Sequence, residues 1–557
     1  MYEIFLASFT SSIVILGSGY FFSFIFFNKA FTYNTISSEI SIYGIIFLSF
    51  LGVFLNFFLE INKNVGSVVL ILCIISFIFF KAYKNYKIIL FASLCTFILI
   101  LCSNVYRPDA GLYHLPVTSM INENKIIIGS SNIHFRFAHS SIIQYFSALY
   151  NTHFFSLAFI TIPSASIFSF YIYYIFENYL KYVKEKNNFL SLFFFLLIIF
   201  SLYSFNRYSN YGNDAVAHIF YFILINKLLT INYFDEIKKN EFYIISLICL
   251  FLLTNKIFMG IVLIIPALIF IYSINKRKII FSKNFIYCFI FLALWILKSV
   301  LTSGCIFYPI SQTCFKNFKI YDNDKTKFEA LSGEAWSKDW INQEDPKLEF
   351  KEYNEKFNWI DTWLKNHFKK VLEKLIPYLI FLLILIIYLF FQEKLKETLN
   401  SEIKKKYLII LYLSLIFSVI WFLKFPIYRY GYSFISISLI LVFCLIFYRR
   451  VKFIENIKTK QIFNSIIIIS LIGFVIKNTH RINQKINLNQ TIYWPDIYSE
   501  KGDFITKNYK PKINQNKILY YYSNGELCMY SKSPCSNYNI KNLKSENKFG
   551  YNIYWIN

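Results

Sequence analysis

Long apolar runs recur along most of this chain and constrain its fold more than any other feature. Runs such as 4–27, 154–176 and 372–391 can each cross about 30 Å of hydrocarbon as a single helix. These runs do not alternate between apolar and polar residues, which excludes the strands of a membrane β-barrel. Only 16% of the 557 residues are charged, against about 25% in soluble domains. The sequence therefore predicts an all-α polytopic membrane protein.

The apolar runs divide into about fourteen predicted transmembrane helices. The first run has no basic residues before it and is too long for the apolar region of a signal peptide, so we expect it to remain as a span. The stretch 242–272 is interrupted at 254–256 and is either one kinked helix or two spans. The predicted spans are 4–27, 40–59, 66–80, 88–103, 154–176, 189–205, 215–232, 242–253, 257–272, 284–300, 371–391, 407–423, 431–448 and 462–476.

Lysine and arginine residues lie mainly in alternate loops between these spans. Such loops stay on the cytoplasmic side of a membrane, so the intervening loops face outward. This alternation favours two spans within 242–272, because a single helix there would reverse the side of every later loop. It also explains the net charge of +25 without a nucleic-acid partner. The predicted outer segments are the N-terminus, 104–153, 206–214, 301–370 and 477–557.

We predict three parts along the chain. Residues 1–87 hold the N-terminal transmembrane helices, and residues 88–476 form the transmembrane core with its outer loops 104–153 and 301–370. Residues 477–557 form a small extracytoplasmic tail of the α+β class.

Two aromatic-rich runs in this tail, 517–522 and 526–530, flank the sequence Ser523-Asn524-Gly525. An Asn-Gly pair favours the tight turn of a two-stranded hairpin, because both residues tolerate positive φ. We therefore predict a hairpin that covers an outer cavity or contacts an acceptor molecule. A disordered tail is the alternative.

Four of the ten cysteines form two local pairs, and both pairs lie in segments that the lysine pattern places outside. Disulfides persist in oxidising compartments, so we predict one disulfide between Cys305 and Cys314 and another between Cys528 and Cys535. Four free thiols are the alternative. A zinc site is disfavoured because no matching His or Cys residues flank either pair. The other six cysteines lie in apolar runs and are interpreted as inert.

Asp109 is the leading candidate for catalysis, because it follows the fourth predicted span at the boundary between membrane and water. Partial desolvation there raises the pKa of a carboxyl group and makes it a better base. Asp109 is therefore predicted to accept a proton from a hydroxyl nucleophile. The alternative is that Asp109 caps the next helix, since Pro108 and Gly111 favour a turn. His114 is predicted to orient a substrate or tune Asp109, or to be an ordinary interfacial histidine.

Four further charged residues on the outer side are candidates for binding a substrate. Arg136 can bind a phosphate group with two parallel hydrogen bonds, and Arg429 lies between two spans where a lipid phosphate would be found. The alternatives are a solvated Arg136 and an Arg429 that reaches to the interface among tyrosines. Lys256 and Asp214 either line the same cavity or end their helices.

Several well-known catalytic motifs are absent from the sequence. It has no Walker loop, no Rossmann glycine fingerprint and no His-Glu-x-x-His motif. Soluble nucleotide chemistry and zinc hydrolysis are therefore not indicated.

A long outer loop with an Asp directly after an early span resembles the GT-C class of membrane glycosyltransferases. More closely, the chain is similar to an uncharacterised family of bacterial multi-pass membrane proteins near that class. The segments that carry the resemblance are 109–114, 129–137, 211–214, 303–314, 426–431 and 528–535.

This resemblance implies a GT-C-like core and a polyprenyl-phosphate-linked sugar donor. It implies transfer to a glycan or lipid acceptor at the periplasmic face of a bacterial inner membrane. Asp109 would act as the base or position the acceptor, and Arg136 and Arg429 would bind the phosphate. No second acid stands beside Asp109, so neither a metal nor a cofactor is expected.

Three other functions remain open. An O-antigen-type polymerase or ligase also has many spans, a large outer loop and essential arginines. A transporter or lipid flippase would place charges within its spans, and this chain has very few there. A non-catalytic scaffold would present the loop 301–370 and the tail to partners.

Overall fold

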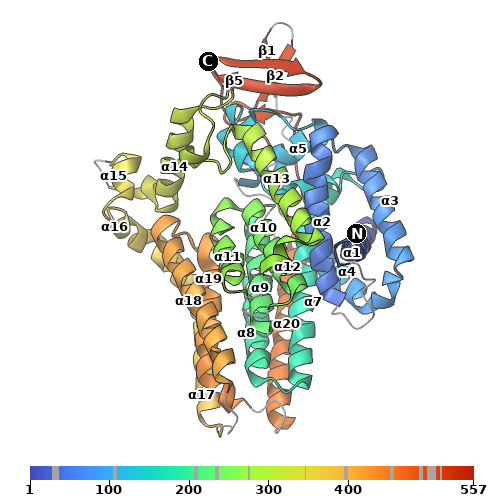
Figure 1. Cartoon of the computed structure of the whole chain (residues 1–557), viewed down its shortest axis with the longest axis vertical. Coiled ribbons are helices and arrows are strands. Elements are labelled where there is room, and N and C mark those ends of the chain that lie inside the picture. Colours follow the sequence, from blue (N-terminus) through green and yellow to red (C-terminus); the bar gives the residue numbers. More distant parts are fainter. Residues whose placement is uncertain are drawn as a thin grey trace.

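The computed structural model describes residues 1–27, 37–103, 109–205, 211–231, 237–273, 276–344, 347–393, 399–451, 457–487, 493–498, 510–514 and 517–556. Figure 1 shows the long helices side by side in one bundle, with the strands at one end of it. We call the described residues of 109–161, 304–368 and 493–556 the cap. The cap contains the strands and several helices of at most 15 residues.

Within these described ranges, nine helices are long and apolar enough to cross a membrane. They contain α1 (Tyr2–Phe27), α2 (Ser37–Phe58), α4 (Tyr86–Ile100), α7 (Ile162–Lys184), α13 (Lys283–Ser303), α17 (Lys369–Phe390), α18 (Ser401–Lys424), α19 (Tyr428–Phe447) and α20 (Ile457–Asn487). The class of multi-pass helical membrane protein is thereby confirmed.

The other predicted spans coincide with helices of at most 17 residues, so a total of fourteen spans stays a prediction. These are α3 (Lys63–Phe79), α8 (Asn188–Ser204), α9 (Asp214–Thr230), α10 (Lys239–Asn255) and α11 (Ile264–Tyr272), which continues from the 3-10 turn η6 (Ile257–Leu263).

The outward surface of the bundle is apolar. Phe289 on α13, Ile384 on α17 and Ile469 on α20 are each at least 60% exposed. Water would disfavour so many exposed apolar side chains, whereas lipid tails contact them at no cost. The exposed faces of these helices are therefore the ones that meet the bilayer.

The segment 242–272 forms two helices, as the lysine pattern predicts. Lys256 has an extended backbone (φ −154°, ψ 117°), so α10 ends at Asn255 and η6 begins after it. The two pieces then run back along each other, because Phe242 near the start of α10 contacts Phe270 near the end of α11, with 6.3 Å between ring centroids. Lys256 therefore occupies the tip of a helical hairpin.

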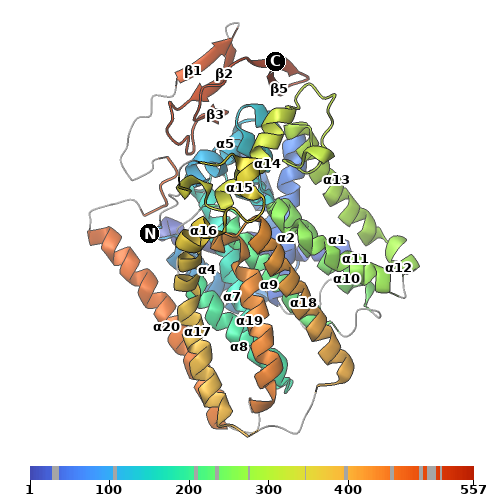
Figure 2. The ribbon, with the colours of Figure 1, turned by 90° about the vertical axis from the view of Figure 1, so that its left-hand side faces the viewer.

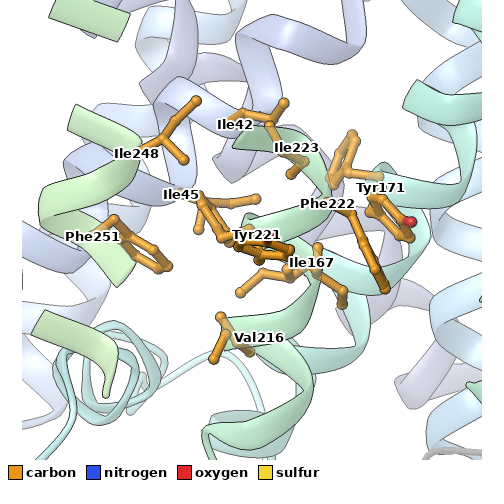
Figure 3. Packing of buried hydrophobic residues seen from close by; sticks show 14 of the residues in the cluster. Ile42, Ile45, Ile167, Tyr171, Val216, Tyr221, Phe222, Ile223, Ile248 and Phe251 are labelled. Atoms are coloured by element: carbon orange, nitrogen blue, oxygen red, sulfur yellow. The ribbon is translucent and has the colours of Figure 1, made fainter. Parts of the chain in front are cut away.

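Helix α9 lies at the centre of the bundle. The phenyl ring of Phe220 stacks on Phe251 of α10 at 4.0 Å, and Phe222 faces Tyr171 of α7 at 6.0 Å. Figure 3 shows Tyr221 and Phe222 among buried side chains of α2, α7 and α10. The residues of α9 from Val216 onward are mostly buried, and its first residue is Asp214.

Both long outer loops fold into helices. Loop 104–153 contains α5 (Leu115–Glu123) and α6 (Ile142–Ala148), and loop 301–370 contains α14 (Asn323–Ser337), α15 (Phe350–Asn354) and α16 (Ile360–Trp363). The sequence of the semi-apolar stretch 140–150 would also allow a helix that lies along the membrane interface, but the structure buries this stretch. Every residue of α6 is buried, because the helix packs beneath α2 and α5.

The tail begins later than predicted, because α20 continues past residue 476 to Asn487. Its strands are β1 (Lys510–Asn514), β2 (Lys517–Tyr522), β3 (Cys535–Ser536), β4 (Leu543–Lys548) and β5 (Tyr551–Ile556). Strand β2 pairs antiparallel with β1 and parallel with β3, while β4 and β5 form a separate hairpin (Figure 2).

The predicted hairpin between 517–522 and 526–530 is therefore wrong. Asn524 and Gly525 do have positive φ (55° and 86°) and make a turn. The chain then leaves the sheet, because the backbone of Met529 bonds to Gly111 in the first outer loop. A contact from another part of the cap replaces the local strand pairing.

Both predicted disulfides are confirmed. The sulfur atoms are 2.07 Å apart in Cys305–Cys314 and 2.09 Å apart in Cys528–Cys535. Both disulfides lie in the cap, whereas the six free cysteines lie within helices of the bundle or at their ends.

Candidate functional site

Five charged residues that are far apart in the sequence meet at the boundary between bundle and cap. Arg136 Nη1 donates to Asp109 Oδ1 at 3.1 Å, and Arg429 Nη1 donates to Asp109 Oδ2 at 2.6 Å. Arg429 Nε lies 3.8 Å from Asp214 Oδ2, and Lys256 Nζ forms an ion pair with Asp214 Oδ1. We call these five residues the charge chain, in which three cations alternate with two carboxylates.

Each member of the charge chain stands at the end of a separate element. Asp109 precedes the π-helical turn η2 (Ala110–His114), and Arg136 lies in the 3-10 turn η4 (Phe135–His139). Asp214 begins α9, Lys256 follows α10, and Arg429 is the second residue of α19. The packing of these elements holds the five side chains together without a continuous sequence motif.

The alternative that Asp109 caps a helix is wrong. Its side chain makes no hydrogen bond to the backbone of η2, because both carboxylate oxygens are occupied by arginines. Asp214 does begin a helix, but its carboxylate bonds to Lys256 instead of the helix backbone.

The electrostatics of Asp109 differ from the sequence prediction. Burial raises the pKa of its carboxyl group, but Arg429 and Arg136 lower it by more, so the pKa lies below its usual value. The prediction of a raised pKa is therefore wrong for this state of the site. Desolvation by itself would raise the pKa of Asp109, but the two guanidinium groups reverse the direction of the shift.

Aromatic rings line the cations of the charge chain. Lys256 Nζ lies 3.5 Å from the ring centroid of Tyr430, and the Arg429 guanidinium lies 5.1 Å from the same ring. Arg136 lies 5.2 Å from the ring of Tyr113. Cation–π contact stabilises positive charge at partly desolvated positions. The side chains of Asp109, Arg136 and Arg429 remain 24%, 33% and 37% exposed, so a polar ligand can reach them.

His114 lies beside the charge chain and is not part of it. Its side chain is buried, and burial lowers the pKa of its imidazole to about 4 although Asp109 and Asp214 act in the opposite direction. The ring is therefore neutral at pH 7. Its Nδ1 atom lies 3.0 Å from Nε2 of Gln144, a fully buried residue that the sequence patterns had not singled out.

A second residue missed by the sequence patterns is His218 of α9. Its Nε2 donates to the carbonyl of Arg429 at 2.8 Å, and its Nδ1 accepts from Ser433 at 2.7 Å. These bonds fix the first turn of α19 and hence the backbone that carries the Arg429 side chain. The only signal in the sequence is a lone histidine inside an apolar run.

The tail closes over the turn that carries Asp109 and His114. Met529 N donates to the carbonyl of Gly111 at 2.8 Å. A Cβ atom on Gly111 would lie 2.3 Å from Met529 Sδ, so the two segments are in close contact. The disulfide Cys528–Cys535 encloses Met529. The tail therefore packs against the turn that carries Asp109 and His114, although its strands do not form the predicted hairpin.

An apolar groove opens between α8, α17 and α20. It has a volume of about 300 Å³, and the polar side chains of its lining are those of Tyr203, Tyr378, Ser470 and Lys477. Phe200 of α8 connects the groove with the start of α19, because its ring centroid lies 5.1 Å from that of Tyr378 and 6.3 Å from that of Tyr432. Tyr432 is one turn from Arg429.

The site offers no evident set of metal ligands. Over the described part of the chain, no three His, Cys, Asp or Glu side chains gather as they would around an ion. The two carboxylates of the charge chain are each paired with cations.

A family model with the description "Domain of unknown function (DUF8201)" matches residues 1–436. The chain belongs to this family. The matched region contains all five members of the charge chain and His114, and it ends before α20 and the strands of the tail. No curated protein and no solved structure gives a significant match to the chain.

Proposed function

We propose that this DUF8201 protein is a membrane glycosyltransferase. It would move a sugar from a polyprenyl-phosphate-linked donor to a glycan or lipid acceptor on the outer side of the membrane. The observation that carries the proposal is the charge chain, which stands partly exposed at the end of a membrane-embedded helix bundle. The enzyme would be GT-C-like in its core.

The charges of the site suit a phosphodiester. The charge chain has one more positive than negative charge, and a lipid-linked sugar monophosphate carries a single negative charge. Arg136 and Arg429 each present a planar fork that matches phosphate oxygens. Arriving phosphate would compete with Asp109 for these arginines. Loss of that pairing would raise the pKa of Asp109 and make it a stronger base.

The apolar groove would receive part of the lipid chain. Its lining is mostly apolar, so the apolar chain of a lipid would fill it in a membrane. Phe200 and Tyr432 link it to the first turn of α19, where Arg429 stands. The donor would therefore lie with its phosphate at Arg429 and its tail directed into the bundle.

Transfer would then proceed with inversion at the anomeric carbon. Asp109 removes the proton from an acceptor hydroxyl, and that oxygen attacks the anomeric carbon as the bond to the lipid phosphate breaks. Arg429 and Arg136 offset the charge that develops on the leaving phosphate. Because lipid phosphate is a good leaving group, this route requires no metal.

An Asp109→Asn variant tests the catalytic role. We expect it to fold and to fail to restore the surface or lipid-linked glycan that is lost when the gene is deleted, because an amide cannot accept the proton. The measurement is the glycan profile of a deletion strain that expresses each variant. Asp361→Asn, an exposed acid in the cap, serves as the control and should restore the glycan. Full restoration by the Asp109 variant would contradict the catalytic assignment.

The cap would face the periplasm from a bacterial inner membrane, because both disulfides lie within it. After mild reduction, we expect an impermeant thiol reagent to label Cys314, the more exposed partner of its disulfide, from outside intact cells. A Cys314→Ser variant controls for reaction at other thiols. Labelling that appears only after the inner membrane is opened would place the cap in the cytoplasm.

A polymerase or ligase centred on arginines is the second candidate, and the two guanidinium groups on one carboxylate favour it. Such an enzyme would tolerate loss of Asp109 better than loss of Arg429. The Asp109→Asn experiment therefore separates the two candidates. A flippase or a scaffold transfers no sugar. In that case even the wild-type protein would leave the lipid-linked sugar unconsumed.

A further inference from the structure

A buried polar network connects His114 with two members of the charge chain. Gln144 and Ser141 stand at the start of α6, and Asn255 ends α10. Ser141 Oγ donates to Asn255 Oδ1 at 2.7 Å, and Asn255 exchanges hydrogen bonds of 2.9 and 3.0 Å with the backbone and side chain of Asn213. Asn255 and Asn213 directly precede Lys256 and Asp214.

The orientation of the Gln144 amide follows from this network. The backbone N–H of Ser141 lies 2.6 Å from one end of the amide, and an N–H group requires an acceptor there. Oε1 of Gln144 must occupy that position, so the NH₂ group faces His114. An NH₂ group only donates, so Nδ1 of His114, 3.0 Å away, must accept. The imidazole proton is thereby placed on Nε2.

We propose that Gln144 is a positioning residue that holds His114 as a neutral donor, with its Nε2–H directed toward the substrate. No described residue accepts a hydrogen bond from Nε2. That atom faces Gly212, where an added Cβ would lie 3.3 Å from it. Glycine at this position therefore leaves space beside the donor that a side chain would fill.

The charged groups around His114 do not overcome its burial. Asp109 and Asp214 favour the protonated ring, Lys256 and Arg429 disfavour it, and burial lowers its pKa to about 4. A neutral ring with its proton on Nε2 cannot remove a proton through that atom. His114 therefore donates a hydrogen bond to a sugar or phosphate oxygen, and the general base is left to Asp109.

The role of His114 as a hydrogen-bond donor to the substrate rests on the proposed function. The placement of its proton on Nε2 does not. Nitrogen-15 spectra of histidine-labelled protein in nanodiscs, with His114→Gln to assign the signal, report which ring nitrogen carries the proton. We expect Nε2 to be protonated and Nδ1 to be bare from pH 5.5 to pH 8. A proton on Nδ1 would overturn the proposal, whatever the enzyme transfers.

A Gln144→Glu variant should reverse the arrangement. One carboxylate oxygen still accepts from Ser141, and the other now accepts from His114, which moves the imidazole proton to Nδ1 and raises the pKa of the ring. We expect kcat to fall about 100-fold at pH 7 with little change in KM, because a donor used in the transition state is lost.

The chain supplies a matched control. Gln484 Nε2 lies 3.0 Å from Nε2 of His480 on the exposed part of α20, outside the site. Gln484→Glu should shift the spectrum of His480 and leave transfer unchanged. An unaltered His114 spectrum in Gln144→Glu would overturn the proposal. If the His114 spectrum shifts in Gln144→Glu but the wild-type protein transfers no sugar, the positioning role of Gln144 stands and only the proposed function is contradicted.

Discussion

Replacing Arg429 with methionine should reduce transfer by a factor of about 100 to 1,000, the usual cost of losing one group that stabilises transition-state charge. Arg429 is the cation shared by both carboxylates of the charge chain. Methionine preserves the bulk of the side chain and removes the charge. Asp109 then retains only Arg136, and Asp214 retains only Lys256.

The same variant should lower the free energy of unfolding by about 1–3 kcal/mol. The loss is smaller than for a fully buried ion pair, because the Arg429 side chain is 37% exposed. Adding Asp214→Asn should lower the stability further, since Lys256 would then lose the carboxylate with which it is paired, and it should not recover transfer. The measurements are the thermal midpoint in detergent and the glycan profile in the deletion strain.

Arg450→Met provides the comparison for Arg429→Met. Arg450 follows α19 at the opposite end and donates to the carbonyl of Phe390. Its loss should leave transfer intact. Equal loss of transfer in the two variants would mean that arginine substitution disturbs the bundle in general, and the assignment of Arg429 to phosphate binding would then be wrong.

Acidification from pH 7 to pH 4.5 should lower the free energy of unfolding by a net value of about 5 kcal/mol, because three buried histidines have pKa values well below the usual histidine value and Glu329 offsets part of their effect. Burial lowers the pKa of His114 to about 4 and those of His134 and His139 to about 3. Arg136 also lowers the last two. The unfolded chain takes up these protons first, so the contribution of the three histidines to stability is complete above pH 6.5 and falls toward pH 4.

Glu329 acts in the opposite direction. Burial raises the pKa of its carboxyl group to about 8, so the folded state holds this proton over a range in which the unfolded state has lost it. Between pH 7 and pH 4.5, Glu329 therefore stabilises the folded state by about 3 kcal/mol, which offsets the effect of about one histidine. The net change of about 5 kcal/mol includes this contribution. Nε2 of His139 lies 3.8 Å from Oε1 of Glu329.

A His139→Gln variant should flatten this pH dependence by about 2–3 kcal/mol, because a group that titrates only in the unfolded state has been removed. The measurement is the thermal midpoint in detergent at pH 7 and at pH 4.5. His480→Gln, on the exposed part of α20, should leave the dependence unchanged. A midpoint that does not move with pH in the wild type would show that these histidines are protonated in the folded protein.

The sequence by itself determined the class of the protein, the positions of its helices and the two disulfides. Each predicted span coincides with a helix, because apolar runs and loop lysines act locally on insertion into a membrane. The break at Lys256 was predictable for the same reason. Asp109, Arg136, Asp214, Lys256 and Arg429 were singled out because charges are rare beside so much apolar sequence.

Only the tertiary structure decided how these five residues are arranged. Their elements are distant in the chain, and packing around α9 brings the ends of α10 and α19 together. The sign of the pKa shift at Asp109, the tautomer of His114 and the pairing of the tail strands all depend on neighbours from other segments. Burial and charge act through space at a few ångströms, and a linear pattern does not contain those distances.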